Sequence, residues 1–361
     1  MKAIIHIGAP KVGSSSIQVL LAKNALALSK LGFAYKQNIK GRGSQFEYPI
    51  AALSRMGIHL PGDDNRLRYK CRTLEEQRKN SIPYAEGLVE LPRRFPDHVA
   101  LFSSEHALPW LTTTENIEEF HKMFLEVFSD VTYLAYFRAP EDLIASQYSE
   151  HIKTGHTKPF GDFFQSKLNS VSTYRRIGKW LDVVGAERLN VRLLNRNWLE
   201  GGDLVTDFCH ACGIDGSGLQ RPPRLNESLT ASGAECLRAL NRTIPQLLSD
   251  GTRNPLHANL IRAVSQRSSD GQKISLNAGQ QRTLRKRMGP DLDWFTNTFF
   301  PHDKALFEPP NANNTPTPVE VRDMALDIMA ELYADSRMAK MDDLTKAQRD
   351  RSIYRQGVGR S

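Results

Sequence analysis

The sequence predicts a three-layer α/β fold with a central parallel sheet. Short apolar runs support this class, because each is continuous rather than alternating and each lies near a stretch with helical spacing; they cover residues 3–7, 99–103, 131–137 and, more weakly, 189–194. Continuous runs are typical of strands that are buried on both faces of a parallel sheet. The length of 361 residues leaves room for one large or two ordinary domains.

The first strand and the first helix are joined by one tight loop. The run AIIHI at 3–7 ends at Gly8, and from Ser14 the apolar residues recur at helical spacing until Leu31 and Gly32 supply a stop. Residues 36–95 are polar and rich in Gly, Pro and Arg, with helical pieces at 49–56 and 73–88. We interpret 36–95 as a helical insertion.

The rest of the chain continues the alternation and then becomes helical. Helices are predicted at 172–185 and 198–212 on either side of the strand at 189–194, and later at 229–244, 277–288 and 318–334. The prolines in 309–318 disfavour both helix and central strand, so this segment is predicted to be a linker. We therefore predict one domain over 1–308, the linker, and a C-terminal helix with a basic tail over 319–361.

Charge and cysteine usage exclude several classes of protein. The net charge is +8, but residues 336–361 hold seven Lys/Arg against three Asp, which is +4, so half of the excess lies in the tail and nucleic acid is not a predicted partner. Four cysteines are too few for a disulfide scaffold. With no signal peptide and no apolar run near the ~18 residues of a transmembrane helix, we expect a cytoplasmic protein.

The strongest local signal is the loop from Gly8 to Ser16, between the first strand and the first helix. Its glycines allow the backbone to approach a ligand, Lys11 adds a positive charge, and the N–H groups that open a helix favour an anion. It is not a Walker A loop, because Ser14 rather than lysine follows Gly13. The loop predicts a P-loop-like phosphate cradle; a turn that binds nothing is the alternative.

A second group of residues follows the strand at 131–137. Arg138 lies at the carboxyl end of this strand, Pro140 fits the first turn of a helix, and Ser146 lies about two turns into that helix. A guanidinium and a hydroxyl in this arrangement can converge on one anion. Taken alone, Arg138 also suits a surface or capping ion pair.

Together the two motifs resemble the sulfotransferases that use 3'-phosphoadenosine 5'-phosphosulfate (PAPS). The segment Lys11-Val12-Gly13-Ser14-Ser15, with Ser16 after it, is similar to the family loop that holds the 5'-phosphosulfate, and Arg138-Ala-Pro140 with Ser146 resembles the element that holds the 3'-phosphate. The resemblance extends over roughly residues 2–300, weakly in 36–95, and is closer to bacterial and carbohydrate-type members. We predict that the insertion 36–95 forms a lid on the acceptor side.

The resemblance also implies a general base, since an acceptor hydroxyl loses its proton as it attacks sulfur. Glu105, after the strand at 99–103, lies where many family members carry this base, and His106 is the second candidate. His59 and Glu47 in the insertion are further candidates. A helix-capping carboxylate is the alternative role for Glu105.

Three other features have simpler interpretations. The cysteines of Cys209-His-Ala-Cys212 lie in a helical pattern without a second ligand pair, so we interpret them as core residues, and His6 as a packed strand residue. A basic cluster in the insertion suits a solvated face or a negatively charged acceptor; it comprises Arg66, Arg68, Lys70, Arg72, Arg78 and Lys79.

The combined prediction is a PAPS-dependent sulfotransferase that transfers a sulfuryl group to a hydroxyl or amine of a small molecule or carbohydrate, without a required metal. The alternatives are a P-loop nucleotide or small-molecule kinase, disfavoured by the missing Walker A lysine, and a non-catalytic nucleotide- or polyanion-binding protein. The sequence carries no signal for the oligomeric state.

Overall fold

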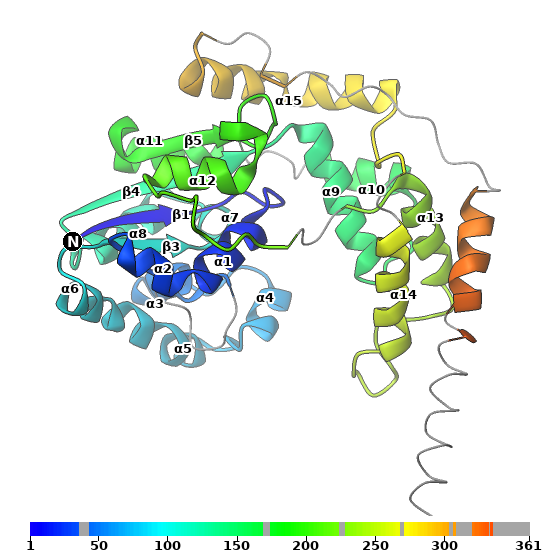
Figure 1. Cartoon of the computed structure of the whole chain (residues 1–361), viewed down its shortest axis with the longest axis horizontal. Helices are drawn as coiled ribbons and strands as arrows, with labels where there is room; N and C mark the ends of the chain where they lie inside the picture. The colour runs from blue at the N-terminus through cyan, green and yellow to red at the C-terminus, as the bar shows by residue number, and fades with distance from the viewer. Residues whose placement is uncertain are drawn as a thin grey trace, which may run out of the picture. The chain divides into compact units, whose positions relative to one another are not determined.

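Five parallel strands form a single sheet in the order β2-β3-β1-β4-β5 (Figure 1). The computed structural model describes residues 1–35, 43–168, 174–223, 228–267, 271–302, 306–307, 320–331 and 333–334. The strands are β1 (Lys2–His6), β2 (Phe33–Tyr35), β3 (Val99–Ser103), β4 (Asp130–Phe137) and β5 (Leu189–Leu193). The predicted P-loop-like α/β fold with a central parallel sheet is confirmed, and the strand before the glycine loop, β1, is the central one.

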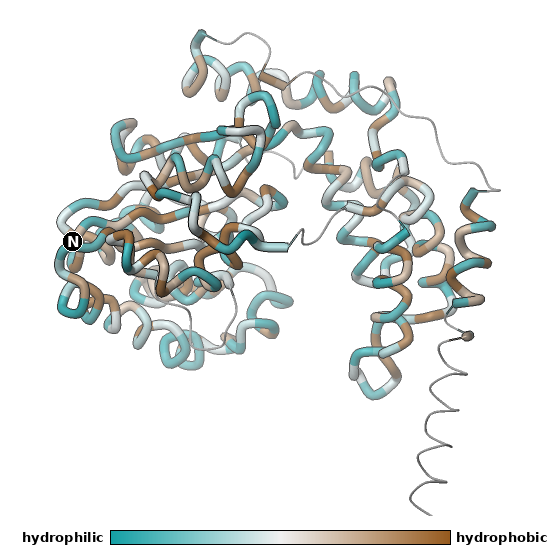
Figure 2. Tube along the Cα trace, viewed as in Figure 1, coloured by the Kyte–Doolittle hydropathy of each residue, from teal (hydrophilic) through white to brown (hydrophobic). Residues whose placement is uncertain are grey.

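Helices cover both faces of this sheet and complete the three layers. One face carries α1 (Ser14–Lys23) and α12 (Leu204–Cys212), which contact each other (Figure 1). The other face carries α8 (Thr114–Leu125), which contacts both α3 (Glu47–Arg55) and α11 (Arg176–Val184). The apolar residues along the strands in Figure 2 lie between these layers.

Large aromatic side chains fill the space between the sheet and its helices. Tyr133 of β4 packs against Trp180 of α11, with ring centroids 5.1 Å apart, and Phe120 of α8 packs against the same indole. On the opposite side of β4, the Tyr136 hydroxyl donates to Asp207 of α12 at 2.6 Å. Because side chains alternate between the two faces of a strand, Tyr133 and Tyr136 of β4 contact helices on opposite faces of the sheet.

Two elements near the N-terminus differ from the prediction. The sequence places no strand after Gly32, but Phe33–Tyr35 pair with β3 as an edge strand. Three residues are too few for a periodic pattern to reveal. The predicted first helix is two helices, α1 and α2 (Ala25–Lys30), which meet at Asn24, whose side chain is hydrogen-bonded to the Leu20 carbonyl and to the backbone of Gln220.

The segment 36–95 is helical where it is described, as predicted, but it is not peripheral. Its helices are α3, α4 (Asp63–Arg68), α5 (Leu74–Glu86), the 3-10 turn η1 (Gly87–Val89) and α6 (Glu90–Arg94). Residues 47–54 of α3 are all buried, and the Tyr48 ring packs against Phe102 and Phe124. The interpretation as an insertion is corrected in this respect: α3 is part of the core, within the connection from β2 to β3.

The remaining elements agree with the predicted order and add three helices. They are α7 (Ala107–Trp110), α9 (Pro140–Lys153), α10 (Phe160–Lys167), η2 (Ala186–Arg188), η3 (Glu200–Gly202), α13 (Ala231–Leu240), α14 (Pro255–Arg267) and α15 (Ala278–Phe299). The helices α7, α10 and α14 were not predicted, and α15 continues through Pro290. No helix among the described residues is both long and apolar enough to cross a bilayer.

Backbone contacts divide the chain into two compact units. Unit 1 comprises 1–144, 166–226 and 280–310, and unit 2 comprises 145–165, 227–279 and 311–361. Within unit 1, Arg285 of α15 donates to both carboxylate oxygens of Glu141, which is 1% exposed at the start of α9. The predicted linker at 309–318 and the residues from 335 lie outside the described residues, 320–331 are helical, and the predicted boundary at 308 stays a prediction.

Candidate functional site

The loop between β1 and α1 is held in a strained, left-handed backbone conformation. Gly8, Lys11 and Gly13 have φ angles of 57°, 62° and 82°. Glycine adopts such angles readily, whereas a left-handed lysine costs about 1–2 kcal/mol. Strain of this kind persists where surrounding contacts impose it, often at ligand sites. The conformation of Lys11, which Lys70 shares with a φ of 57°, therefore makes this loop one functional candidate.

Gly8 brings the loop against the turn that follows β3. A Cβ atom at Gly8 would lie 2.8 Å from the Cα atom of Glu105 and 3.3 Å from the Ser14 hydroxyl. The same turn is hydrogen-bonded to β1, because the Ser104 amide donates to the His6 carbonyl at 2.8 Å. The candidate base is thus held next to the candidate anion loop, at the carboxyl ends of adjacent strands.

We expect Gly8→Ala to lower the free energy of unfolding by more than the about 1–2 kcal/mol that a left-handed alanine costs. The additional loss comes from the contact with the Glu105 backbone. Gly32→Ala is the matched control, since Gly32 also has a positive φ (83°) but no atom within 4 Å of its built Cβ. Urea unfolding of both variants measures the difference; equal losses would show that the close approach is unimportant.

Arg138 contacts the loop directly. Its Nη1 donates to the Lys11 carbonyl at 2.9 Å, and its Nη2 lies 3.8 Å from the Asp142 carboxylate. The Tyr174 hydroxyl donates to the Arg138 carbonyl and holds the end of β4. Burial lowers the pKa of Arg138, against the effects of Asp142 and Tyr174. The structure therefore brings the two motifs together at Arg138 and Lys11.

Unused polar atoms at this junction suit an anionic ligand. The Arg138 Nε is buried and has no hydrogen-bond partner in the described part of the chain, and the buried Ser14 hydroxyl lies beside Glu105. Lys11, Ser15 and Ser16 are half-buried, and Val12 is buried below the loop. Burying donors without partners is costly, so a ligand with several acceptor oxygens would satisfy them.

Ser146 is half-buried on α9, two turns beyond Arg138. Arg138 belongs to unit 1, whereas Ser146 belongs to unit 2. Its convergence with Arg138 on one phosphate stays a prediction.

Glu105 is half-buried, and burial raises the pKa of its carboxyl group. The positive charges of Lys11 and Arg68 and the neighbouring Ser14 hydroxyl act in the opposite direction. A carboxylate whose pKa is raised is a better proton acceptor than an exposed one. Its place beside the loop and its raised pKa are compatible with the predicted role of general base, which stays a prediction.

His106 is engaged at both ring nitrogens. Nδ1 is 3.0 Å from the Ser44 hydroxyl, Nε2 is 2.8 Å from the Tyr69 hydroxyl, and the ring packs against Trp110 with centroids 4.2 Å apart. Burial, with a smaller contribution from Arg68, lowers the pKa of His106 to about 4. This arrangement suits a neutral residue that supports the Glu105 turn.

The other candidate side chains lie elsewhere. His59 is exposed after α3, and the charge of Glu47, which is buried, helps to raise the pKa values of Tyr35, Tyr48 and Tyr84. His6 is fully buried, with its Nδ1 2.9 Å from the Ser103 hydroxyl. Cys209 and Cys212 are free, buried thiols whose pKa values are raised by burial.

Sequence reasoning missed the residues that surround His106. Ser44 and Tyr69 come from the segment before β3, and Arg68 was recognised only as one member of a basic cluster. The RLRYK run at 66–70 indicates a concentration of positive charge, but only the fold shows that Arg68 lies close enough to lower the pKa of Glu105. Among the described residues, no group of three or more His, Cys, Asp or Glu is placed to hold a metal ion.

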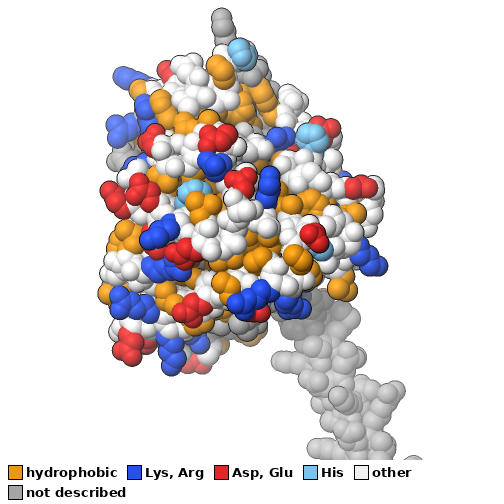
Figure 3. All heavy atoms as spheres, turned by 90° about the vertical axis from the view of Figure 1, so that its left-hand side faces the viewer, with side chains coloured by type: hydrophobic (Ala, Val, Ile, Leu, Met, Phe, Trp, Pro, Cys, Tyr) orange, Lys and Arg blue, Asp and Glu red, His pale blue; other side chains and the backbone are white. Residues whose placement is uncertain are grey.

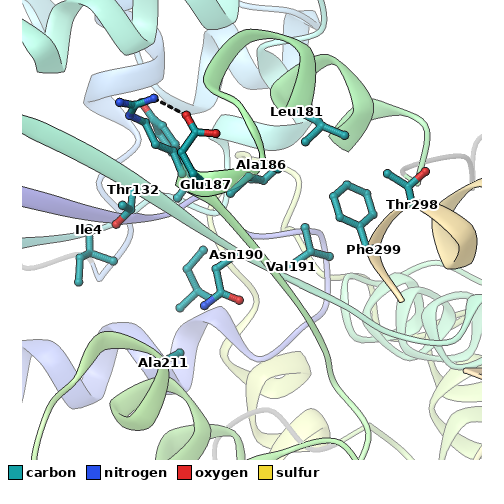
Figure 4. A pocket seen from close by; sticks show the side chains of 14 residues that line it. Ile4, Thr132, Leu181, Ala186, Glu187, Asn190, Val191, Ala211, Thr298 and Phe299 are labelled. Carbon is teal, nitrogen blue, oxygen red and sulfur yellow. Dashed lines mark hydrogen bonds and ion pairs between the residues drawn. The ribbon is translucent and has the colours of Figure 1, made fainter. Parts of the chain in front are cut away.

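A cavity of about 640 Å³ lies apart from this site, along β4 and β5 (Figure 4). Its lining includes Ala186, Asn190 and Phe299, and the ion pair between Glu187 and Arg188 lies at its edge. Apart from Phe299, which ends α15, these residues lie at and before the amino end of β5, whereas ligands of parallel sheets bind at the carboxyl ends. Side chains of both signs are interspersed on the face drawn in Figure 3.

The fold and the loop define a class of protein: a parallel α/β protein with a glycine-containing loop after its central strand and basic and hydroxyl groups around that loop. No protein-family model matches the chain, and no curated protein matches it. Among solved structures, a sulfotransferase from Alicyclobacillus acidocaldarius aligns with 82% of this chain and 94% of its own length, with 14% sequence identity and a TM-score of 0.43.

Proposed function

We propose that the protein is a sulfotransferase that moves a sulfuryl group from PAPS to a hydroxyl group of an acceptor. The observation that carries this proposal is the hydrogen bond from Arg138 to the Lys11 carbonyl, which unites the two motifs that resemble the donor-binding elements of that family. Glu105 beside the same loop supplies the third requirement, a base for the acceptor.

Each residue has a distinct role in the proposed reaction. Lys11 and the loop residues Val12, Gly13, Ser14, Ser15 and Ser16 hold the phosphosulfate, and Arg138 and Ser146 hold the 3'-phosphate. Glu105 takes the proton from the acceptor hydroxyl as its oxygen bonds to sulfur and the bond from sulfur to the bridging oxygen breaks. Lys11 stabilises the negative charge that develops on that bridging oxygen. The products are a sulfate ester and 3'-phosphoadenosine 5'-phosphate (PAP).

The proposal requires no metal ion. Lys11 and the loop amides have to neutralise less negative charge on the phosphosulfate than a triphosphate carries. The acceptor is a small molecule or a carbohydrate. His106 supports the base through its bonds to Ser44 and Tyr69.

Donor recognition tests the proposal. We expect the protein to bind PAP more tightly than 5'-AMP, and Arg138→Ala to reduce that preference by about 10- to 100-fold, the scale of hydrogen bonds to a charged group. Titration calorimetry with PAP, 5'-AMP and ATP measures the preference. Arg93→Ala, an exposed arginine on α6, is the control. Tighter binding of ATP would indicate a kinase, and equal affinities would indicate a general polyanion-binding protein.

A further inference from the structure

Arg68 is connected to the candidate base through a short chain of contacts. It ends α4, and its guanidinium lies 6.0 Å from the centroid of the Tyr69 ring. The Tyr69 hydroxyl lies 2.8 Å from the His106 Nε2, and His106 follows Glu105 in the chain. The side chain of Arg68 is exposed, so it is accessible to a ligand that approaches Glu105.

Arg68 differs from Arg66 and Arg78 in having no polar partner, a feature that its side chain shares with Arg72. Arg66 pairs with Asp63 and also donates to the Leu60 carbonyl, and Arg78 donates to the Ser54 carbonyl. In the part of the chain that the structure describes, the Arg68 side chain has neither a hydrogen bond nor an ion pair. It makes a cation–π contact with the Tyr69 ring. Its guanidinium donors therefore remain available, held in place by an aromatic face.

The charge of Arg68 reaches Glu105. It lowers the pKa of Glu105, together with Lys11 and Ser14, against the effect of burial. Arg68 ends α4, Lys11 lies in the loop between β1 and α1, and Ser14 begins α1. His106 is the titratable group next to Glu105 in the chain. An anion bound to Arg68 would cancel its contribution and make Glu105 a stronger base.

We propose that the natural acceptor is anionic, and that Arg68 binds its negative group while its hydroxyl meets Glu105. This rests on the proposed sulfotransferase function and names the class of its substrate: hydroxylated molecules that carry a carboxylate or a similar anion, such as acidic saccharides. Guanidinium groups recognise carboxylates through paired hydrogen bonds. Without such a cation, an anionic acceptor would be repelled by the Glu105 carboxylate.

Matched acceptor pairs test this proposal. Methyl β-glucuronide is compared with methyl β-glucoside, and 4-hydroxybenzoate with 4-hydroxybenzamide, so that each pair differs in one negative charge. Transfer from labelled PAPS gives kcat/KM, and calorimetry on the PAP-bound protein gives the affinity. We expect the anionic member to be favoured by about 10-fold or more, the scale of one charged hydrogen bond. Arg68→Ala should bring that ratio close to 1, and Arg68→Lys should keep part of it.

Arg72→Ala is the control, because Arg72 is an exposed arginine in the same cluster that does not influence Glu105. It should keep the wild-type ratio. Preference for the neutral members, a preference that survives Arg68→Ala, or no binding and no transfer for either anionic probe would overturn the proposal. PAP binding is measured in parallel: if it is retained in those cases, the sulfotransferase proposal stands and only the anionic acceptor is wrong.

The pH profile gives a second readout that a merely structural role would not move. Arg68 lowers the pKa of Glu105, so removing Arg68 raises it. The acid limb of kcat/KM, where Glu105 becomes protonated, should therefore move to higher pH in Arg68→Ala. An unchanged acid limb would contradict the electrostatic link between the two residues.

Discussion

We expect Glu105→Gln to lower the turnover number by about 10²- to 10⁴-fold, the usual range for loss of a general base. Glutamine keeps the size of the side chain and its place beside the loop, but it cannot accept the acceptor proton. Affinity for PAP should change little, because the residues proposed to bind the donor are intact. Turnover with saturating PAPS and calorimetry with PAP measure the two effects.

Two comparisons make the Glu105 result specific. Glu86→Gln, an exposed glutamate on α5, should keep wild-type turnover. His106→Asn should lose activity through the turn it supports and should also lower the unfolding midpoint, because the contacts with Ser44, Tyr69 and Trp110 are lost. Full activity in Glu105→Gln with a dead but stable His106→Asn would reverse the assigned roles.

The second large effect is expected for Lys11→Ala. This variant should lose about 2.7–4 kcal/mol of transition-state stabilisation, the range for one removed oxyanion donor. Alanine removes the ammonium group but keeps the carbonyl that accepts from Arg138, so the loop should stay in place. Turnover at saturating PAPS measures the loss, and thermal unfolding checks that stability is retained.

Lys23→Ala is the matched control for this experiment. Lys23 is exposed in the last turn of α1, on the helix that the loop opens, but at the end away from it. It should leave turnover unchanged. If Lys11→Ala kept wild-type turnover, Lys11 would not stabilise the transition state as proposed, whatever the affinity of the variant for PAPS.

The sheet could be predicted because its long strands appear in the sequence as continuous apolar runs. The runs at 99–103 and 131–137 are continuous and apolar, and both became strands within one residue of their predicted bounds. The strand at 33–35 and the break at Asn24 could not be predicted in this way. The first pairs with β3, and at the second the Asn24 side chain is hydrogen-bonded to the backbone of Gln220, so both involve contacts that leave no periodic pattern.

The site was predictable where a motif is local. The loop at 8–16 and Arg138 each lie at the carboxyl end of a predicted strand, and parallel strands bring such ends together. The role of α3 in the core was missed because polar residues, Glu47 and Ser54, are buried together with its apolar ones. The Tyr69–His106 contact joins residues 37 positions apart across a helical segment, and no spacing rule predicts it.

The ion pair between Glu141 and Arg285 has a consequence for how the chain is made. These residues lie 144 positions apart, and 280–310 is the last part of unit 1 to be synthesised. At about 5–20 residues per second, a ribosome takes roughly 7–29 s to add Arg285 after Glu141. During that interval the carboxylate lacks the cation that neutralises it in its buried position, and an unpaired buried charge is strongly destabilising. The nascent N-terminal part of unit 1 therefore remains incomplete until α15 emerges, and stopping translation between these positions yields a product that a protease should degrade.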